Sequence, residues 1–171
     1  MYNAEEIPSD LFNIVKNVLI SKEVVFFGSY AILQYSKYMP KRQQNIKVSN
    51  FDVLSLEPEK VAMELKGSLN AKGFDNVNVK QFPSVGEIVS SHFQVIVDQK
   101  PIVFVYFPLA CHSYNRIREV KKWIKIATIE TMMSFYLAFL YTSRTYYNKE
   151  RTWQNIFLKF NKSIDLNKTE C

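Results

Sequence analysis

Several residue types are scarce in this chain of 171 residues, and each scarcity excludes a class of protein. The chain has two cysteines and two histidines, and they form no pattern with the spacing of metal ligands. No apolar run reaches the roughly 18 residues that a membrane span requires. The first ten residues are acidic and contain no apolar core, so an export signal is not expected. We therefore expect a cytoplasmic protein in a reducing compartment that has no membrane partner.

Glycine is scarce as well, and all four glycines lie between residues 28 and 86. A second half without glycine suits a helical layer that has no tight loops. Charge is also unevenly distributed. Residues 1–114 carry eleven Lys and Arg and eleven Asp and Glu, so their charges balance. Residues 115–171 carry eleven Lys and Arg but only five Asp and Glu. A local basic surface attracts polyanions, although a solvated helix face would give the same excess.

What the chain does have is apolar and aromatic side chains, with 47% hydrophobic residues, thirteen Phe and ten Tyr. This composition predicts one folded domain over residues 1–171. Periodicity and turn residues predict helices at 9–20, 30–38, 58–71, 116–125, 129–141 and 145–164, and strands at 24–27, 50–56, 77–82, 92–97 and 102–107. The fold class is therefore α+β (mixed α/β), with a sheet-containing core at 1–114 and a helical, basic part at 115–171.

The most informative stretch joins a buried strand to a helix and then to a second strand. The apolar run 24–27 ends at Gly28 and Ser29, where a tight turn and a helix start can present backbone N–H groups to phosphate. Asn50 and Asp52 lie on the same face of the following strand, because strand side chains alternate. The alternatives are an ordinary strand-to-helix turn and a strand-end acid that pairs with a nearby Lys or Arg.

This outline is typical of nucleotidyl transfer, in which two divalent ions hold a triphosphate and activate the attacking hydroxyl. The ions need several carboxylates, two from an acid-x-acid strand and a third from a neighbouring strand. The first acid position is Asn50 here, and the third falls on the strand 102–107 at Phe104. Asp98 lies just before this strand in sequence, but the residues around it indicate a turn. An amide binds divalent cations weakly and a phenyl ring does not bind them, so the site is expected to be depleted.

These motifs resemble those of the nucleotidyltransferase superfamily, which includes DNA polymerase beta. Residues 128–136 and the tract 140–151 give a narrower similarity to poly(A) polymerase catalytic subunits of large cytoplasmic DNA viruses, of the mimivirus and African swine fever virus type. The resemblance implies a polymerase-beta-like mixed sheet flanked by helices. It also implies that the catalytic positions are Gly28, Ser29, Asn50 and Asp52, with Asp52 as the metal ligand. Those polymerases resemble tandem copies of this fold, and 171 residues accommodate one copy.

Three functions follow as hypotheses. The first is a pseudoenzyme without cofactor, a non-catalytic or regulatory subunit in mRNA 3′-end polyadenylation that forms a homodimer or a heterodimer with an active polymerase subunit. The second is an active polynucleotide adenylyltransferase that uses ATP and binds Mg²⁺ or Mn²⁺ at Asp52 with another acid, such as Glu57 or Asp98. The third is an RNA-binding module that uses the basic C-terminal third.

Basic side chains are the candidates for nucleotide or RNA contacts. They are Lys41, Arg42, Lys47, Arg144, Lys149 and Arg151. Exposed loops and solvated helices are commonly charged, so a purely structural role is the alternative. The Met and aromatic residues of 132–141 indicate either core packing or a dimer interface.

Overall fold

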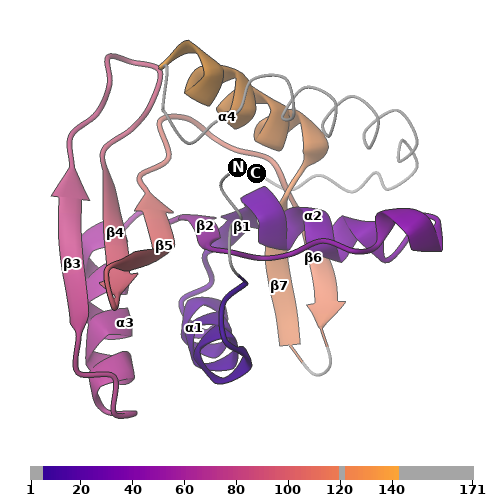
Figure 1. The fold of residues 1–171 in the computed structure, drawn as a ribbon. Coiled ribbons are helices and arrows are strands. Elements are labelled where there is room, and N and C mark those ends of the chain that lie inside the picture. Colours follow the sequence, from indigo (N-terminus) through magenta and orange to yellow (C-terminus); the bar gives the residue numbers. More distant parts are fainter. Residues whose placement is uncertain (1–5, 120–121, 143–171) are drawn as a thin grey trace.

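The computed structural model describes residues 6–119 and 122–142, which fold around one seven-stranded mixed sheet (Figure 1). The elements in chain order are α1 (Ser9–Ser21), β1 (Val25–Phe27), α2 (Gly28–Ser36), a 3₁₀ turn η1 (Lys41–Gln43), β2 (Phe51–Leu54), α3 (Pro58–Asn70), β3 (Val77–Phe82), β4 (His92–Val97), β5 (Lys100–Tyr106), β6 (Tyr114–Glu119), β7 (Lys122–Ala127) and α4 (Ile129–Tyr141). The predicted α+β class is confirmed.

The strand order in the sheet is β3-β4-β5-β2-β1-β7-β6. The two strands of the sequence motif are neighbours, because β1 pairs antiparallel with β2. β2 then pairs parallel with β5, and β1 pairs parallel with β7. Segments that are far apart in the chain therefore meet at the centre of the sheet.

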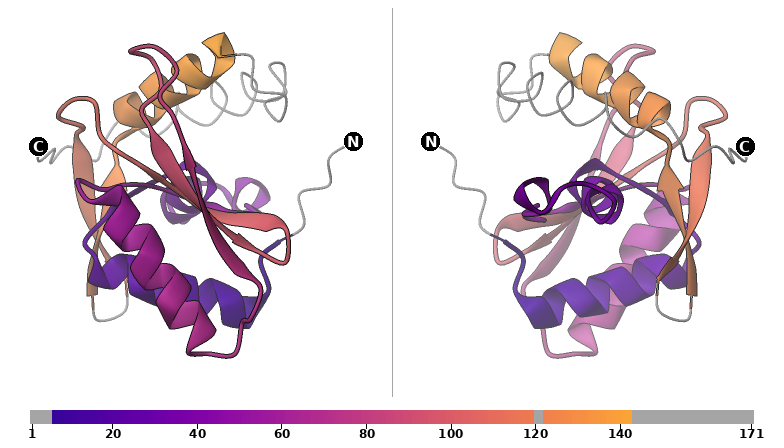
Figure 2. Two further views of the ribbon diagram at one scale, coloured as in Figure 1. Left: turned by 90° about the vertical axis from the view of Figure 1, so that its left-hand side faces the viewer. Right: turned by 90° about the vertical axis from the view of Figure 1, so that its right-hand side faces the viewer.

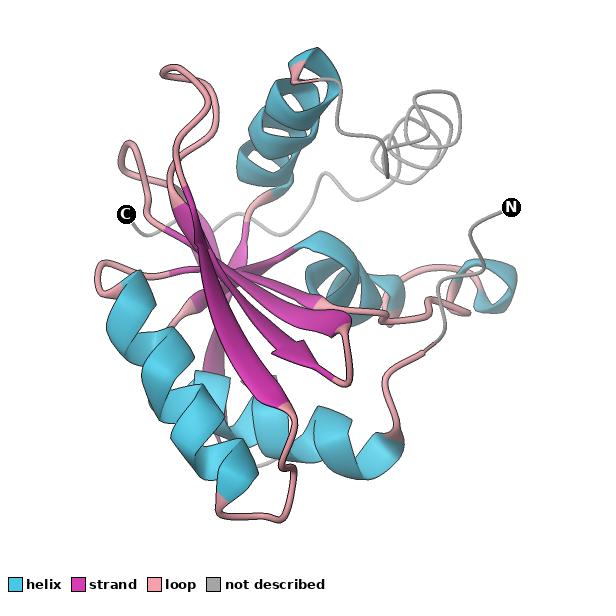
Figure 3. Cartoon of the chain, turned by 60° about the vertical axis from the view of Figure 1, so that its left-hand side comes forward, coloured by secondary structure: helices cyan, strands magenta, loops and turns pink. Residues whose placement is uncertain are grey.

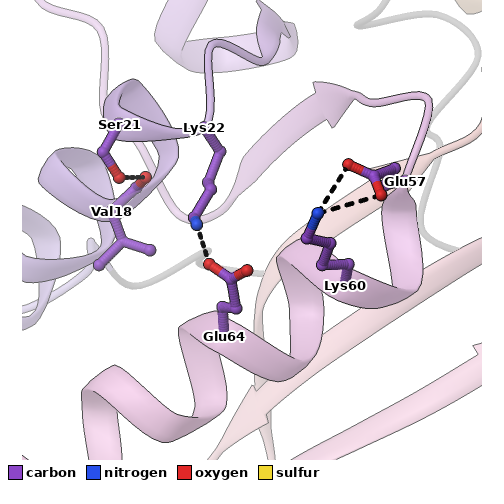
Figure 4. Close-up of polar contacts among 6 residues, drawn as sticks. All are labelled: Val18, Ser21, Lys22, Glu57, Lys60 and Glu64. Carbon is purple, nitrogen blue, oxygen red and sulfur yellow. Dashed lines mark hydrogen bonds and ion pairs between the residues drawn. The ribbon is translucent and has the colours of Figure 1, made fainter.

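Helices cover both sides of the sheet (Figure 2). α1 and α3 lie on one side, where an ion pair between Lys22 and Glu64 joins them (Figure 4). On this side the ring of Phe51 lies 5.0 Å from that of Phe12 in α1. α4 lies on the other side, where Phe135 stacks on Phe27 with ring centroids 4.6 Å apart. The alternation of strand side chains thus divides the apolar core between the two faces.

Local sequence signals explain several of the element ends. Thr128 caps α4, because its hydroxyl accepts a hydrogen bond from the backbone N–H of Thr131. Pro58 stands in the first turn of α3, where a missing N–H costs nothing. Asp98 and Gln99 both have positive φ, at 48° and 66°, which is the geometry of a tight turn between antiparallel strands. The predicted β4–β5 hairpin is confirmed (Figure 3).

One predicted element is wrong. The basic residues 116–125, predicted to be helical, form most of an antiparallel hairpin made of β6 and β7. The reason is a period of two: Ile124 and Ile126 are buried, and Lys125 between them points the other way. The sheet-containing part of the chain therefore extends to Ala127 and has seven strands. The helix predicted at 145–164 lies outside the described residues.

Two tyrosines of α2 hold this hairpin in place. The Tyr30 hydroxyl donates a 2.7 Å hydrogen bond to Glu119 Oε2 on β6. The Tyr35 hydroxyl donates a 2.9 Å bond to the carbonyl oxygen of Ala127 on β7, and it accepts a 3.0 Å bond from Asn115 Nδ2. α2 thus links the β1–β2 centre of the sheet to its β6 edge. None of the helices within residues 6–119 and 122–142 has the length and apolar character to cross a membrane.

Candidate functional site

Gly28 is the point at which β1 ends and α2 begins. Its φ of +67° is a conformation that side chains rarely adopt, so a glycine is favoured here. The residue is also buried against β2. A Cβ atom at this position would overlap the carboxylate oxygen Oδ2 of Asp52. Gly28 therefore serves two local needs, the turn itself and the close approach of the Asp52 side chain.

The next residue, Ser29, ties the start of α2 to the start of β2. Its hydroxyl donates a 3.2 Å hydrogen bond to the backbone carbonyl oxygen of Asn50. The Gly28-Ser29 turn is therefore in direct contact with Asn50, just before β2, and with Asp52 in β2. The structure thus brings together four of the residues predicted to form the site.

Asn50 and Asp52 lie on the same side of the chain, as the strand period predicts. Asn50 Nδ2 donates a 2.9 Å hydrogen bond to Asp52 Oδ2, and Asn50 Oδ1 accepts a 3.2 Å bond from the hydroxyl of Ser49. A neutral amide donor therefore stands where an acid-x-acid strand would carry a second carboxylate. A hydrogen bond of this kind favours the charged form of a carboxylate.

Aromatic side chains flank Asp52 on both neighbouring strands. Phe104 of β5 is its partner in the parallel β2–β5 register, and Phe27 of β1 is its partner in the antiparallel β1–β2 register. Side chains at paired positions lie on the same face of a sheet. Phe104 is only 9% exposed. The position that the sequence predicted for the third acid is therefore a buried ring beside Asp52.

α4 covers this face of the sheet and brings a phenol close to Asp52. Burial raises the pKa of the Tyr136 hydroxyl far above its ordinary value, and the negative charge of Asp52 raises that pKa further. Tyr136 is therefore neutral at any physiological pH. The sequence prediction assigned Tyr136 to packing or to an interface and missed its nearness to Asp52, because only the three-dimensional fold places α4 over β2.

Comparisons with known proteins show what fold surrounds this arrangement. No protein-family model matches the sequence, and no curated protein matches it significantly. The structure is similar to the crystal structure of the Megavirus polyadenylate synthase, with a TM-score of 0.67 and 12% sequence identity. The similarity covers 92% of this chain and 35% of the synthase chain.

The fold is nucleotidyltransferase-like. It resembles that of a viral poly(A) polymerase, which is the likeness expected from residues 128–136 and the tract 140–151. The chain spans about a third of the length of the synthase that it matches, at 35%. At 12% identity the similarity establishes the fold, and any activity has to be argued from the residues themselves.

Among residues 6–119 and 122–142, no three His, Cys, Asp or Glu side chains gather closely enough to hold a metal ion. The two alternative acids have other partners. Glu57 accepts hydrogen bonds from Lys60 Nζ at 3.1 Å in the first turn of α3 (Figure 4), and Asp98 accepts one from Asn76 Nδ2 at 3.3 Å.

Three of the six predicted basic contacts lie at the exposed surface of the segment before β2. Lys41 and Arg42 are exposed on η1, and Lys47 is exposed in the loop before β2. Arg144, Lys149 and Arg151 lie outside the described residues. A role for these six residues in binding nucleotide or RNA therefore stays a prediction.

Proposed function

We propose that this chain is a catalytically degenerate nucleotidyltransferase-fold protein, related to viral-type poly(A) polymerases, that acts as a non-catalytic or regulatory subunit in mRNA 3′-end polyadenylation. The observation that carries the proposal is the hydrogen bond from the Asn50 amide to Asp52. Two carboxylates at this separation repel each other unless a cation lies between them. An amide and a carboxylate attract each other, so this arrangement is stable without an ion.

The neighbouring strand supports the same conclusion. A third carboxylate at position 104 would complete a cage of oxygen ligands, whereas the Phe104 ring offers none. Phe104 lies in the aromatic layer of this sheet face, with its centroid 6.3 Å from the His92 ring. Replacing it with an acid would bury a charge in apolar surroundings. Both departures from the acidic pattern thus fit their surroundings as packed, neutral groups.

A site of this kind would affect tail synthesis only through an active partner. We propose that the chain binds an active polymerase subunit or a second copy of itself, and that Asp52 has no catalytic task in the complex. Tyr136, the α4 residue that interacts with the Asp52 charge, is buried, so it supports the site from within the domain.

The direct test is a tailing assay with purified protein, radiolabelled ATP and an RNA primer, run separately with Mg²⁺ and Mn²⁺. We expect no tail, alongside an active poly(A) polymerase as a positive control. Robust synthesis that Asp52→Ala abolishes would overturn the proposal and favour the active enzyme with an unconventional metal site.

A second test measures metal binding without activity. The wild-type melting temperature is expected to stay unchanged when Mn²⁺ is added. Asn50→Asp is expected to melt lower than wild type in a metal-free buffer, because it replaces a hydrogen bond with repulsion, and to recover stability with Mn²⁺. A Mn²⁺-dependent rise in the wild type that Asp52→Ala removes would show a functioning cation site.

The regulatory role has its own measurement. Adding the protein to an active polymerase from the same source is expected to change tail length or primer affinity, and Asp52→Ala is expected to have the same effect as wild type. Light scattering on each protein and on the mixture separates self-association from pairing. No change in tail length or primer affinity, with no complex in the mixture, would rule out the subunit role.

A further inference from the structure

The β6–β7 hairpin presents a strongly basic face with aromatic rings, which the sequence patterns did not reveal. Alternation turns Ile117, Ile124 and Ile126 towards the core. The opposite set of side chains consists of Tyr114, Arg116, Arg118, Trp123 and Lys125, and we call it the hairpin platform. In the register, Trp123 stands opposite Arg118, and Lys125 stands opposite Arg116. Such cross-strand pairs lie side by side on one face.

Trp123 supplies the largest ring of this platform and lies at its turn end, opposite Arg118. Its side chain is 64% exposed, although tryptophan is one of the residue types that are mostly buried. An exposed indole contributes little to the core, so its stacking face is available to a ligand. The second ring, that of Tyr114, lies 5.6 Å from Lys125 Nζ in a cation–π contact. The platform therefore combines flat aromatic surface with positive charge.

Two described acids have partners near the hairpin, Glu119 and Glu23. Glu119 of β6 points to the other face, where Tyr30 and Lys16 hold its carboxylate, with Lys16 Nζ at 3.5 Å. Glu23 pairs with Lys125 at 3.2 Å at the edge of the platform. Arg116 and Arg118 are exposed, and together with Lys125 they place three cations on this face of the hairpin.

The surface beside the platform is concave on two sides. A cleft of about 470 Å³ is lined by Arg116, Trp123 and Lys125 together with residues of α1 and β1. A second cleft of about 430 Å³ is lined by Tyr114 and Lys125 and extends to Leu54 of β2. Lys125 pairs with Val25, and Val25 pairs with Leu54, so this second cleft runs along the sheet face that also carries Asp52.

We propose that the hairpin platform binds single-stranded RNA, with one base stacked on Trp123 and phosphates held by Arg116, Arg118 and Lys125. Single strands expose the faces of their bases, and proteins bind them by stacking aromatic side chains in a positively charged groove. A duplex hides those faces, and an acidic protein segment would use the cations without the indole. The proposal rests on the RNA part of the proposed function but uses none of the residues around Asp52.

The test measures equilibrium binding of a fluorescein-labelled single-stranded oligo(A) by anisotropy, without ATP or divalent cations. Trp123→Ala is expected to lower the affinity roughly 5- to 150-fold, which is the stacking contribution of one base. Arg118→Gln is expected to reduce the salt dependence, lowering the slope of log affinity against log salt by about 0.7 if it contacts one phosphate.

Matched controls lie on α3 and just after it, on the other side of the sheet. Met63 is an exposed apolar residue at 52%, and Lys72 is an exposed cation just after the helix. Met63→Ala and Lys72→Gln are expected to leave the affinity within twofold of wild type. In a Trp153→Phe background Trp123 is the remaining tryptophan, so its emission should be quenched when the RNA binds.

Three outcomes would overturn the proposal. One is equal affinity of wild type and Trp123→Ala for the single strand. Another is equally tight binding of a duplex of the same length, with no quenching of Trp123. The third is that poly-glutamate displaces the labelled RNA as effectively as unlabelled RNA does, and that Trp123→Ala does not change this competition. That result would indicate an acidic protein partner. Because these readouts need no tail synthesis, their failure is distinguishable from failure of the proposed degenerate site.

Discussion

Replacing Gly28 with alanine tests the geometry of the site through stability alone. The substitution acts in two ways, because the position has a φ of +67° and because the new Cβ would overlap the Asp52 carboxylate. A side chain in the left-handed region costs about 1–2 kcal/mol. Forcing extra volume into a packed site costs about 1–3 kcal/mol. We expect Gly28→Ala to lower the free energy of unfolding by roughly 2–5 kcal/mol.

Two other glycines separate these contributions. Gly73 has a φ of +88° and open space around its Cβ position, so Gly73→Ala should incur the backbone cost alone. Gly67 lies inside α3 with nothing within 4 Å, and Gly67→Ala should stabilise the protein by about 0.5–1 kcal/mol. Urea unfolding of the three variants, followed by circular dichroism, gives the comparison.

A double-mutant cycle then isolates the contact with Asp52. In an Asp52→Ala background the carboxylate is gone, although a Cβ at Gly28 still lies 3.1 Å from the Cβ of residue 52. Gly28→Ala should therefore cost about 1–2 kcal/mol less in this background than in wild type. A coupling below about 0.5 kcal/mol would refute the close approach of Gly28 and Asp52.

Three further predictions concern other parts of the fold. Gln99→Gly should raise the free energy of unfolding by about 0.5–1 kcal/mol, because glycine adopts the positive φ of the β4–β5 turn without strain. A urea midpoint lower than that of wild type would contradict this prediction. Thr128→Ala should lower that free energy by about 1 kcal/mol through loss of the α4 cap, whereas Thr142→Ala at the other end of α4 should have little effect in the same titration. Burial lowers the pKa of His112 below its ordinary value, so the unfolded chain takes up a proton first. The free energy of unfolding should therefore fall as the pH drops through about 6.5. The urea midpoint should fall less across this range in His112→Gln than in wild type. Equal falls in the two proteins would show that His112 does not cause the pH dependence.

Much of the central fold could be predicted because its signals are local. The strand β1, the Gly28 turn, the start of α3 at Pro58 and the Thr128 cap of α4 each depend on residues that are adjacent in sequence. The shared face of Asn50 and Asp52 follows from the strand period. The approach of Gly28 to Asp52 and the position of Tyr136 could not be predicted, since both depend on how distant segments pack.

The β6–β7 hairpin was missed for a different reason. Its outward side chains are Arg, Lys and Trp, so its composition indicated a basic helix, and the alternation of Ile117, Ile124 and Ile126 was the weaker signal. Pairing with β1 decides the outcome, because backbone groups of β7 find partners on a strand about a hundred residues earlier. Sequence reasoning weighs local preferences and has no access to such a partner.

The narrow pairing between β1 and β7 has a mechanical consequence. β1 has three residues, and its register with β7 contains two pairs, Val25 with Lys125 and Phe26 with Ile126. The hairpin therefore joins the rest of the sheet through a short strand pairing. The hydroxyls of Tyr30 and Tyr35 on α2 add hydrogen bonds from α2 to the hairpin strands. We expect the hairpin to open along this strand pairing as one cooperative unit, ahead of the β2–β5 half. In the double variant Tyr30→Phe, Tyr35→Phe, amide hydrogen exchange should then accelerate in β6 and β7 while β4 and β5 stay protected. Equal acceleration in all four strands would show that the hairpin does not open separately from the rest of the sheet.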